Sequence, residues 1–258
     1  MDNLQTHRSP EEGFLPSLWK QALNFFFPPV CFACEDKLGN NDDVFCTYCR
    51  QALAYIPDRI CRLCGAPVKE ELFGEEKCPE CPPGTLYFDR ALSPLYYYGP
   101  IIPAVHALKF RRRREMAHLF ARMIFHYLQK RVNKITCDVI VPVPLHPLRW
   151  LKRGFNQSEV MAEEISRLGG YPIYSRAIRR IRSTKPQTRL RSTHRSENVE
   201  GAFAPGKNED ISGRNVILLD DVFTTGSTIN ACAKALKEGG AEKVFAVTLC
   251  RALSPENL

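Results

Sequence analysis

The pattern of hydrophobic and polar positions divides the chain near residue 84. Beyond that point, short apolar runs alternate with longer stretches in which apolar residues recur every three to four positions. The short runs predict buried strands and the longer stretches predict helices. Strands that alternate with helices predict an α/β fold with a mostly parallel sheet. The expected strands are 90–98, 138–143, 215–219 and 243–250, and the expected helices are 103–110, 114–132, 157–168 and 227–237.

The first third of the chain follows a different pattern. Apolar positions at helical spacing run from Leu15 to Phe26 and stop before Pro28, which predicts a short amphipathic helix. Lys20 is its only cation, so packing on the following module is favoured over binding to a membrane surface. Residues 31–81 show little periodicity. We therefore expect a tail with this helix at 1–27, a small cysteine-rich module at 28–84 and the α/β domain at 85–254.

Eight of the 11 cysteines form four C-x-x-C pairs. Such a pair presents two sulfurs on one turn, and four thiolates complete the tetrahedron of Zn²⁺. The pairs therefore predict two zinc sites, which are structural because four thiolates leave no open position. Successive pairing, a double zinc ribbon, is preferred; an interleaved arrangement also fits the spacing, and iron–sulfur ligation is a weaker alternative. The candidate ligands are Cys31, Cys34, Cys46 and Cys49 for one site, and Cys61, Cys64, Cys78 and Cys81 for the other.

This cysteine usage also bears on the compartment. Metal binding by free thiols is typical of a reducing environment, so we expect a cytoplasmic protein. No run of about 18 apolar residues occurs, so we expect no membrane span. The remaining cysteines, Cys137, Cys232 and Cys250, fall in or beside predicted strands and helices and are expected to be core residues.

The segment from Val216 to Thr228 carries the most specific pattern: four apolar residues, two aspartates and a hydroxyl-rich turn that opens a helix. The apolar residues predict a strand that brings Asp220 and Asp221 to the sheet edge where ligands bind in open α/β folds. In the turn, N–H groups at a helix N-terminus form an anion site, and Gly226 lets the backbone close around a phosphate. Carboxylates beside an anion need a neutral partner, and a ribose diol satisfies both. The segment predicts a site for a ribose with a 5′-phosphate.

Residues upstream of this segment are candidates for further phosphate contacts. Three prolines within 142–147 predict a rigid turn, and cations and amides follow it. Such groups hold pyrophosphate and Mg²⁺-bound oxygens, although a solvated turn with a capping Asn156 explains them equally well. The basic stretch 180–198 predicts a mobile loop. The candidates for pyrophosphate and loop contacts are Lys109, which is a weaker one, with His146, Arg149, Arg153, Asn156, Gln157, Gln187 and Arg195.

The net charge of +8 is concentrated in the middle of the chain. Residues 85–200 contain 22 Lys and Arg against 8 Asp and Glu, a formal +14. This favours a phosphate-rich ligand, whether a pyrophosphate-bearing sugar, a nucleotide or a nucleic acid strand. Clustered arginines supply a surface for single-stranded DNA, although such runs are usually solvated faces. The clusters are Arg111 to Arg114, and Arg176, Arg179, Arg180 and Arg182.

Residues 216–228 are similar over all their positions to the motif with which type I phosphoribosyltransferases bind 5-phosphoribosyl-1-pyrophosphate (PRPP) together with Mg²⁺. The resemblance implies that Asp220 and Asp221 contact the ribose 2′- and 3′-hydroxyls and are the catalytic candidates. It also implies that a loop at 184–203 closes over the reacting centre. The remaining PRPP-binding candidates are Val222, Thr224, Thr225, Gly226, Ser227 and Thr228, of which the last five hold the 5′-phosphate.

The whole chain resembles one family within this class. The cysteine-rich front, VPVPLHP, RGFNQ, T-x-x-Q-T-x-L and LLDDVFTTGST are similar to the ComF family of competence-related, phosphoribosyltransferase-like proteins, from about Phe26 to Arg251. This implies a role in DNA uptake or in nucleotide and nucleic acid metabolism. Three functions stay open: a phosphoribosyltransferase with an unknown acceptor, a single-stranded DNA-binding protein that works with DNA-uptake proteins, and a PRPP sensor.

Overall fold

The structure, a computed structural model, describes residues 29–38, 44–69, 77–110, 114–131, 136–182 and 201–252. The chain divides into two compact units, Met1–Gln51 and Ala52–Leu258. The predicted tail and helix at 1–27 lie outside the described residues, as does most of the predicted loop. Within the described part, no helix combines the length and the apolar character that crossing a bilayer requires. The domain boundary at residue 84 remains a prediction.

The described part of the first unit consists of turns and one short helix. Val30 and Lys37 form an antiparallel bridge that closes a turn. The turn holds Cys31 and Cys34, and the helix α2 (Thr47–Gln51) that follows carries the buried Cys49.

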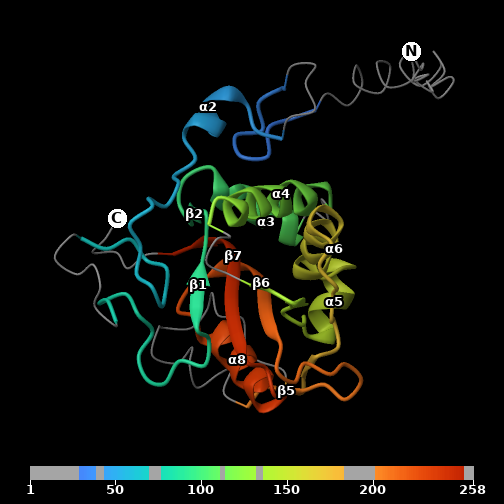
Figure 1. Ribbon diagram of the computed structural model, residues 1–258. Helices are drawn as coiled ribbons and strands as arrows, with labels where there is room; N and C mark the ends of the chain where they lie inside the picture. Colours follow the sequence, from blue (N-terminus) through green and yellow to red (C-terminus); the bar gives the residue numbers. More distant parts are fainter. Residues whose placement is uncertain are drawn as a thin grey trace, which may run out of the picture. The chain divides into compact units, whose positions relative to one another are not determined.

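The second unit is built on a five-stranded sheet (Figure 1). The strand order is β1-β7-β6-β3, and β2 also pairs with β7. Every pairing in this sheet is parallel, which confirms the expected fold class. The strands are β1 (Arg90–Leu92), β2 (Leu95–Tyr96), β3 (Val139–Pro142), β6 (Asn215–Phe223) and β7 (Lys243–Arg251).

The inner strand β6 is apolar on both of its faces because helices cover both. Val216 and Leu218 belong to a core that includes Leu236 of α8. Ile217 and Leu219 alternate to the other face, where α4 and α6 contact the sheet. Figure 1 shows α4 beside α6 and apart from α8. The helices are α3 (Ile101–Phe110), α4 (Glu115–Gln129), α6 (Gln157–Gly169) and α8 (Ser227–Glu238).

Three differences from the predicted elements have physical causes. The strand expected at 90–98 is interrupted at Pro94, which has no N–H for the ladder, and so becomes β1 and β2. The segment before Gly154 forms a short helix, α5 (Pro147–Arg153), with no buried residue and therefore no apolar period. Two strands that were not expected, β4 (Ile178–Arg180) and β5 (Phe203–Pro205), pair antiparallel at the two ends of the segment that was expected to be a loop, and each is too short to show a hydrophobic period.

Candidate functional site

Two adjacent aspartates lie near the carboxyl end of β6, which extends to Phe223. Asp221 is 4% exposed, whereas Asp220 is partly exposed. Successive residues of a strand point to opposite faces. The two carboxyl groups therefore have different neighbours, although they are adjacent in sequence.

Asp221 forms an ion pair with Lys109 in the last turn of α3. The distance from Lys109 Nζ to Asp221 Oδ2 is 2.8 Å. Burial by itself lowers the pKa of Lys109, but the charge and hydrogen bond of Asp221, together with the charge of Asp220, outweigh it and raise that pKa above its ordinary value. The ammonium therefore keeps its charge at neutral pH. Lys109, a weaker candidate from the sequence, lies in direct contact with Asp221.

Asp220 accepts two hydrogen bonds at Oδ1. The Ser158 hydroxyl donates one and the N–H of Asp221 donates the other, both at 2.9 Å. Burial and the charge of Asp221 raise the pKa of Asp220 to about 6, although Lys109 and these two donors act in the opposite direction. The carboxyl group therefore titrates close to neutral pH, as is common at functional sites.

Two predicted ligand residues act as helix caps. Asn156 Oδ1 accepts the N–H of Ser158 at 3.1 Å, and its Nδ2 donates to the carbonyl of Val143, also at 3.1 Å. The cap thus ties the start of α6 to the end of β3 and holds Ser158 beside Asp220. His146 Nδ1 accepts the N–H of Leu148 at 3.2 Å and caps α5. A contact of either residue with a ligand remains a prediction.

The helix α5 contributes two arginines one turn apart, Arg149 and Arg153. Arg153 Nη1 donates to Gln157 Oε1 at 3.0 Å, and its guanidinium lies 5.6 Å from the ring centroid of Phe110. Burial lowers the pKa of both arginines, and the charge of Asp221 opposes this effect at Arg153. Arg153 is therefore part of the electrostatic environment of the aspartates, and the charge of Arg149 acts on Arg153 in turn.

Arg180 adds a cation from the end of β4. Its guanidinium lies 5.2 Å from the ring centroid of Phe203. Burial and then the charge of Arg149 lower its pKa, and Asp220 is among the groups that oppose them. The sequence grouped Arg180 with a DNA-binding surface and gave no sign of Ser158. In the sequence only their positions could have indicated a role: Arg180 begins the basic stretch 180–198, and Ser158 lies at the start of a predicted helix.

The turn after β6 is closed around a glycine. Gly226 has a φ of 74°, in the left-handed region, and a Cβ there would lie 2.7 Å from the Phe223 ring. The hydroxyl oxygens of Thr225 and Ser227 are 2.8 Å apart. A helix leaves its first N–H groups without intrahelical partners, so the start of α8 suits an anion. The predicted residues Val222 in β6, Thr224 and Thr225 in the turn, and Ser227 and Thr228 at the start of α8 are all partly exposed.

The cysteines form two tetrads in the predicted successive order: Cys31, Cys34, Cys46 and Cys49, and Cys61, Cys64, Cys78 and Cys81. Within each tetrad the sulfurs lie within 4.8 Å of one another. Individual sulfur–sulfur distances include 3.7 Å in the first tetrad and 3.5 and 3.8 Å in the second. A tetrahedron with Zn–S bonds of about 2.3 Å has edges of about 3.8 Å. The residues therefore fit two structural zinc sites, and the interleaved arrangement is excluded.

The two tetrads begin with the same turn. The N–H of Cys31 donates to the carbonyl of Asp36, and the N–H of Cys61 donates to that of Ala66, both at 2.7 Å. In the second turn the hydrogen bond between the two thiols lowers the pKa of Cys61 and raises that of Cys64, while burial raises the pKa of Cys81.

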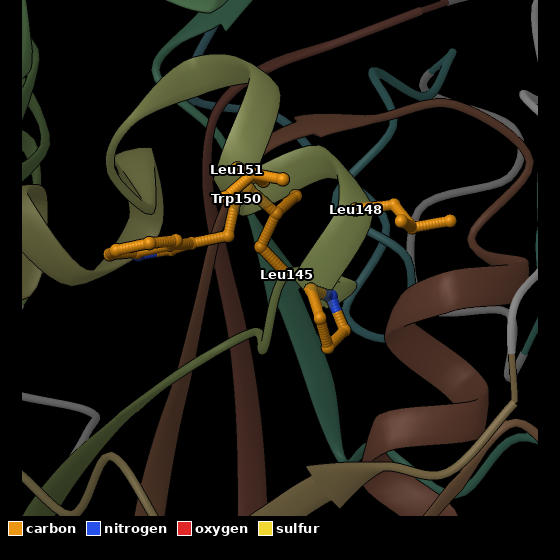
Figure 2. A pocket seen from close by; sticks show the side chains of 5 residues that line it. Leu145, Leu148, Trp150 and Leu151 are labelled. Atoms are coloured by element: carbon orange, nitrogen blue, oxygen red, sulfur yellow. The ribbon is translucent and has the colours of Figure 1, made fainter.

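The outward side of α5 is apolar. Leu148 and Leu151 are 69% and 72% exposed, and Trp150 is 50% exposed. Figure 2 shows these side chains spreading away from the helix. Together with Leu145 and Pro147 they line a hollow of about 450 Å³. None of the predicted phosphate-binding residues lines it, so we do not assign it to the candidate site.

Two predicted site residues, Gln187 and Arg195, lie outside the described residues. The structure brings Lys109 into contact with Asp221 and Arg153 into contact with Gln157, and the charges of both aspartates act on Arg153. The turn residues 222–228 follow directly along the chain.

Comparisons with known proteins agree with this arrangement. Residues 22–82 match the family described as the double zinc ribbon domain, and residues 159–257 match the phosphoribosyl transferase domain. The chain is 31% identical over 229 residues to the DNA utilization protein YhgH of Escherichia coli K12, a match that covers 88% of this chain and 98% of that protein.

Two further relatives carry names that refer to competence. Competence protein F of Haemophilus influenzae is 28% identical over 232 residues, covering 88% of this chain and 99% of the relative. Competence protein ComFC of Bacillus subtilis is 28% identical over 240 residues, covering 86% and 95%. The similarity thus includes both the cysteine-rich front and the sheet domain.

Proposed function

Because this chain belongs to the ComF family of competence-related, phosphoribosyltransferase-like proteins, we propose that it binds PRPP with Mg²⁺ at the carboxyl end of β6. One observation carries the proposal. Asp220 and Asp221, held by Ser158 and Lys109, are followed directly by the turn at Gly226 that opens α8. A sugar with a free diol and a 5′-phosphate binds to both features at once, the diol to the aspartates and the phosphate to the turn.

Each part of the site has a role toward one part of PRPP. Asp220 and Asp221 accept hydrogen bonds from the ribose 2′- and 3′-hydroxyls. Backbone N–H groups and hydroxyls of residues 224–228 donate to the 5′-phosphate. Mg²⁺, when bound with PRPP, neutralises part of the pyrophosphate charge. The cations that face the pyrophosphate are Lys109, Arg149, Arg153 and Arg180.

These roles suit transfer of the phosphoribosyl group. The bond from C1′ to the pyrophosphate oxygen breaks, and a bond from an acceptor nucleophile to C1′ forms. No protein nucleophile is needed, because catalysis in this class stabilises the departing charge and holds the sugar. Lys109 stays positively charged beside the aspartates because the Asp221 carboxylate pairs with its ammonium group. Pyrophosphate release in the presence of candidate acceptors distinguishes transfer from PRPP sensing.

Binding of PRPP is tested by calorimetry with Mg²⁺ present. Asp220→Asn and Asp221→Asn are each expected to weaken affinity about tenfold or more, because a diol hydroxyl loses a charged acceptor. The matched control is Glu163→Gln, which removes a charge from an exposed position of α6. Wild-type protein that shows no PRPP binding, or a double aspartate variant with unchanged affinity, overturns the proposal.

A second candidate function is binding of single-stranded DNA. The observation in its favour is that Arg176, Arg179 and Arg182 are exposed around β4, close in sequence to Arg180 at the site. We expect oligo(dT) affinity to fall steeply with salt, and the log–log slope to decrease by about 0.7 for each of these arginines replaced by Gln that contacts a phosphate. Fluorescence anisotropy at several salt concentrations measures it; an unchanged slope in the triple variant removes this surface from consideration.

A further inference from the structure

A buried arginine joins the second cysteine tetrad to the phosphate-binding turn. Arg251, the last residue of β7, is 2% exposed. Its Nη1 donates to the backbone carbonyl of Cys64, one of the predicted zinc ligands. Its guanidinium also lies 5.0 Å from the ring centroid of Phe223, the last residue of β6 before the turn. One side chain therefore contacts a metal-ligand residue and the base of the turn.

A second contact runs through Pro82, which follows the ligand Cys81 in sequence. A Cβ on Gly226 would lie 2.9 Å from Pro82 Cγ and 2.7 Å from the Phe223 ring. The turn thus packs directly against the residue next to the tetrad. Phe223 is held in addition by the edge of Phe88, with ring centroids 6.0 Å apart.

The position of the Cys64 carbonyl matters because Arg251 has few alternatives. Its Nε has no hydrogen-bond partner among the described residues. A buried guanidinium that loses an acceptor bears a desolvation cost, so it tends to move toward another partner. Such a movement removes the cation from the Phe223 ring, and the turn above that ring loses support. The conformation of the Cys61–Cys64 turn depends in its own right on the metal that holds its thiolates.

We propose that zinc at the second tetrad holds the phosphate-binding turn in its binding conformation through Arg251 and Pro82. Ligand affinity at the turn then depends on this zinc. Arg251 is a positioning residue in this scheme and has no contact with the ligand. The affinity part of the proposal rests on the proposed function, whereas the conformational part does not. It does not extend to the first tetrad, which belongs to the other compact unit.

The test uses the full chain and three measurements: zinc content, hydrogen exchange of residues 223–228, and calorimetric affinity for PRPP with Mg²⁺. Arg251→Met is expected to keep both zinc ions, to increase exchange in the turn and to weaken affinity about tenfold. Cys81→Ser is expected to lose one zinc and to show the same two changes. Arg251→Lys, which keeps a donor for the Cys64 carbonyl, is expected to recover most of the affinity.

Arg214→Met is the matched control. Arg214 also lies over an aromatic ring, 5.6 Å from the centroid of Tyr174, and also donates to a backbone carbonyl, that of Asp210 at 3.2 Å. We expect its exchange and affinity to equal those of the wild type. If a variant does not fold, the measurements are made instead on wild-type protein to which a zinc-selective chelator has been added. Cys34→Ser reports the effect of losing zinc from the first tetrad.

The outcomes separate this proposal from the proposed function. If the wild type binds PRPP and loss of the second zinc changes neither exchange nor affinity, the coupling is wrong and the function stands. If the wild type binds no PRPP but exchange at 223–228 still responds to the second zinc and to Arg251→Met, the function is wrong and the coupling stands. Equal responses to Arg251→Met and Arg214→Met also overturn the coupling.

Discussion

Opposing influences act on the carboxyl group of Asp220. Burial and Asp221 raise its pKa to about 6, and the Ser158 hydroxyl is among the groups that lower it. Because that hydroxyl donates to the ionised form at 2.9 Å, Ser158→Ala is expected to raise the pKa of Asp220 further. Carbon-13 NMR titration of the carboxyl group measures the change. The control is Ser166→Ala, elsewhere on α6, which removes the hydrogen bond that the Ser166 hydroxyl donates to the Tyr171 carbonyl. An unchanged or lower pKa in Ser158→Ala contradicts the expectation.

The same carboxyl group makes stability depend on pH. Its folded-state pKa of about 6 lies above the unfolded value of about 3.9, so the folded state binds this proton more tightly. The resulting stabilisation is fully present below about pH 4 and is lost as pH rises through about 6. Asp220→Asn stays neutral and is therefore expected to be more stable than wild type by about 1 to 3 kcal/mol at pH 8, and by roughly half as much at pH 5. Urea unfolding at both pH values measures the difference in stability between the variant and the wild type. If that difference does not change with pH, the proton on Asp220 is not its cause.

At the scale of elements, the start of α6 is fixed by a single side chain. Asn156 caps the helix and also donates to the Val143 carbonyl after β3. Asn156→Ala loses both hydrogen bonds and is expected to lower the free energy of unfolding by about 1 to 2 kcal/mol. Asn156→Asp keeps the capping oxygen but not the donor, so it should fall between alanine and wild type. Urea unfolding ranks the three proteins, and an aspartate variant no more stable than the alanine variant rules out a capping role.

The sequence predicted the elements whose side chains repeat with a period and missed those that lack one. The strand at Asn215 and the helix after Gly226 were expected because an apolar run and an apolar stripe mark them. The helix α5 buries no residue, so only its cap and the terminal Gly154 define it. The aspartates and tetrads could be predicted because their members are close in sequence. The contacts of Ser158 and Arg251 could not, because folding brings together segments 62 and 187 residues apart.

At the scale of the whole chain, the segment before residue 84 is connected to the sheet by backbone contacts. The N–H of Ala91 donates to the carbonyl of Leu63 at 2.7 Å, and the N–H of Tyr96 donates to that of Ala54 at 2.9 Å. A Cβ on Gly65 would lie 2.3 Å from the Ala91 carbonyl oxygen, so the two backbones approach closely. The second zinc ribbon therefore packs as part of the unit that contains the sheet.

Two truncations test where this unit begins. The fragment 52–258 retains the second tetrad and its contacts, so we expect it to fold cooperatively with one zinc per chain. The fragment 85–258 removes the carbonyls of Leu63, Ala54 and Cys64, which accept from Ala91, Tyr96 and Arg251. Because each lost hydrogen bond costs about 0.5 to 1.5 kcal/mol, and more for a charged donor, it should be less stable by several kcal/mol or fail to fold. Urea unfolding and zinc analysis compare the two fragments, with Cys61→Ser in the longer one to separate loss of the metal from loss of the segment. Equal stability of both fragments would instead place the domain boundary at residue 84, as the hydrophobic pattern suggests, because the contacts across that point would then contribute nothing to the fold of the sheet.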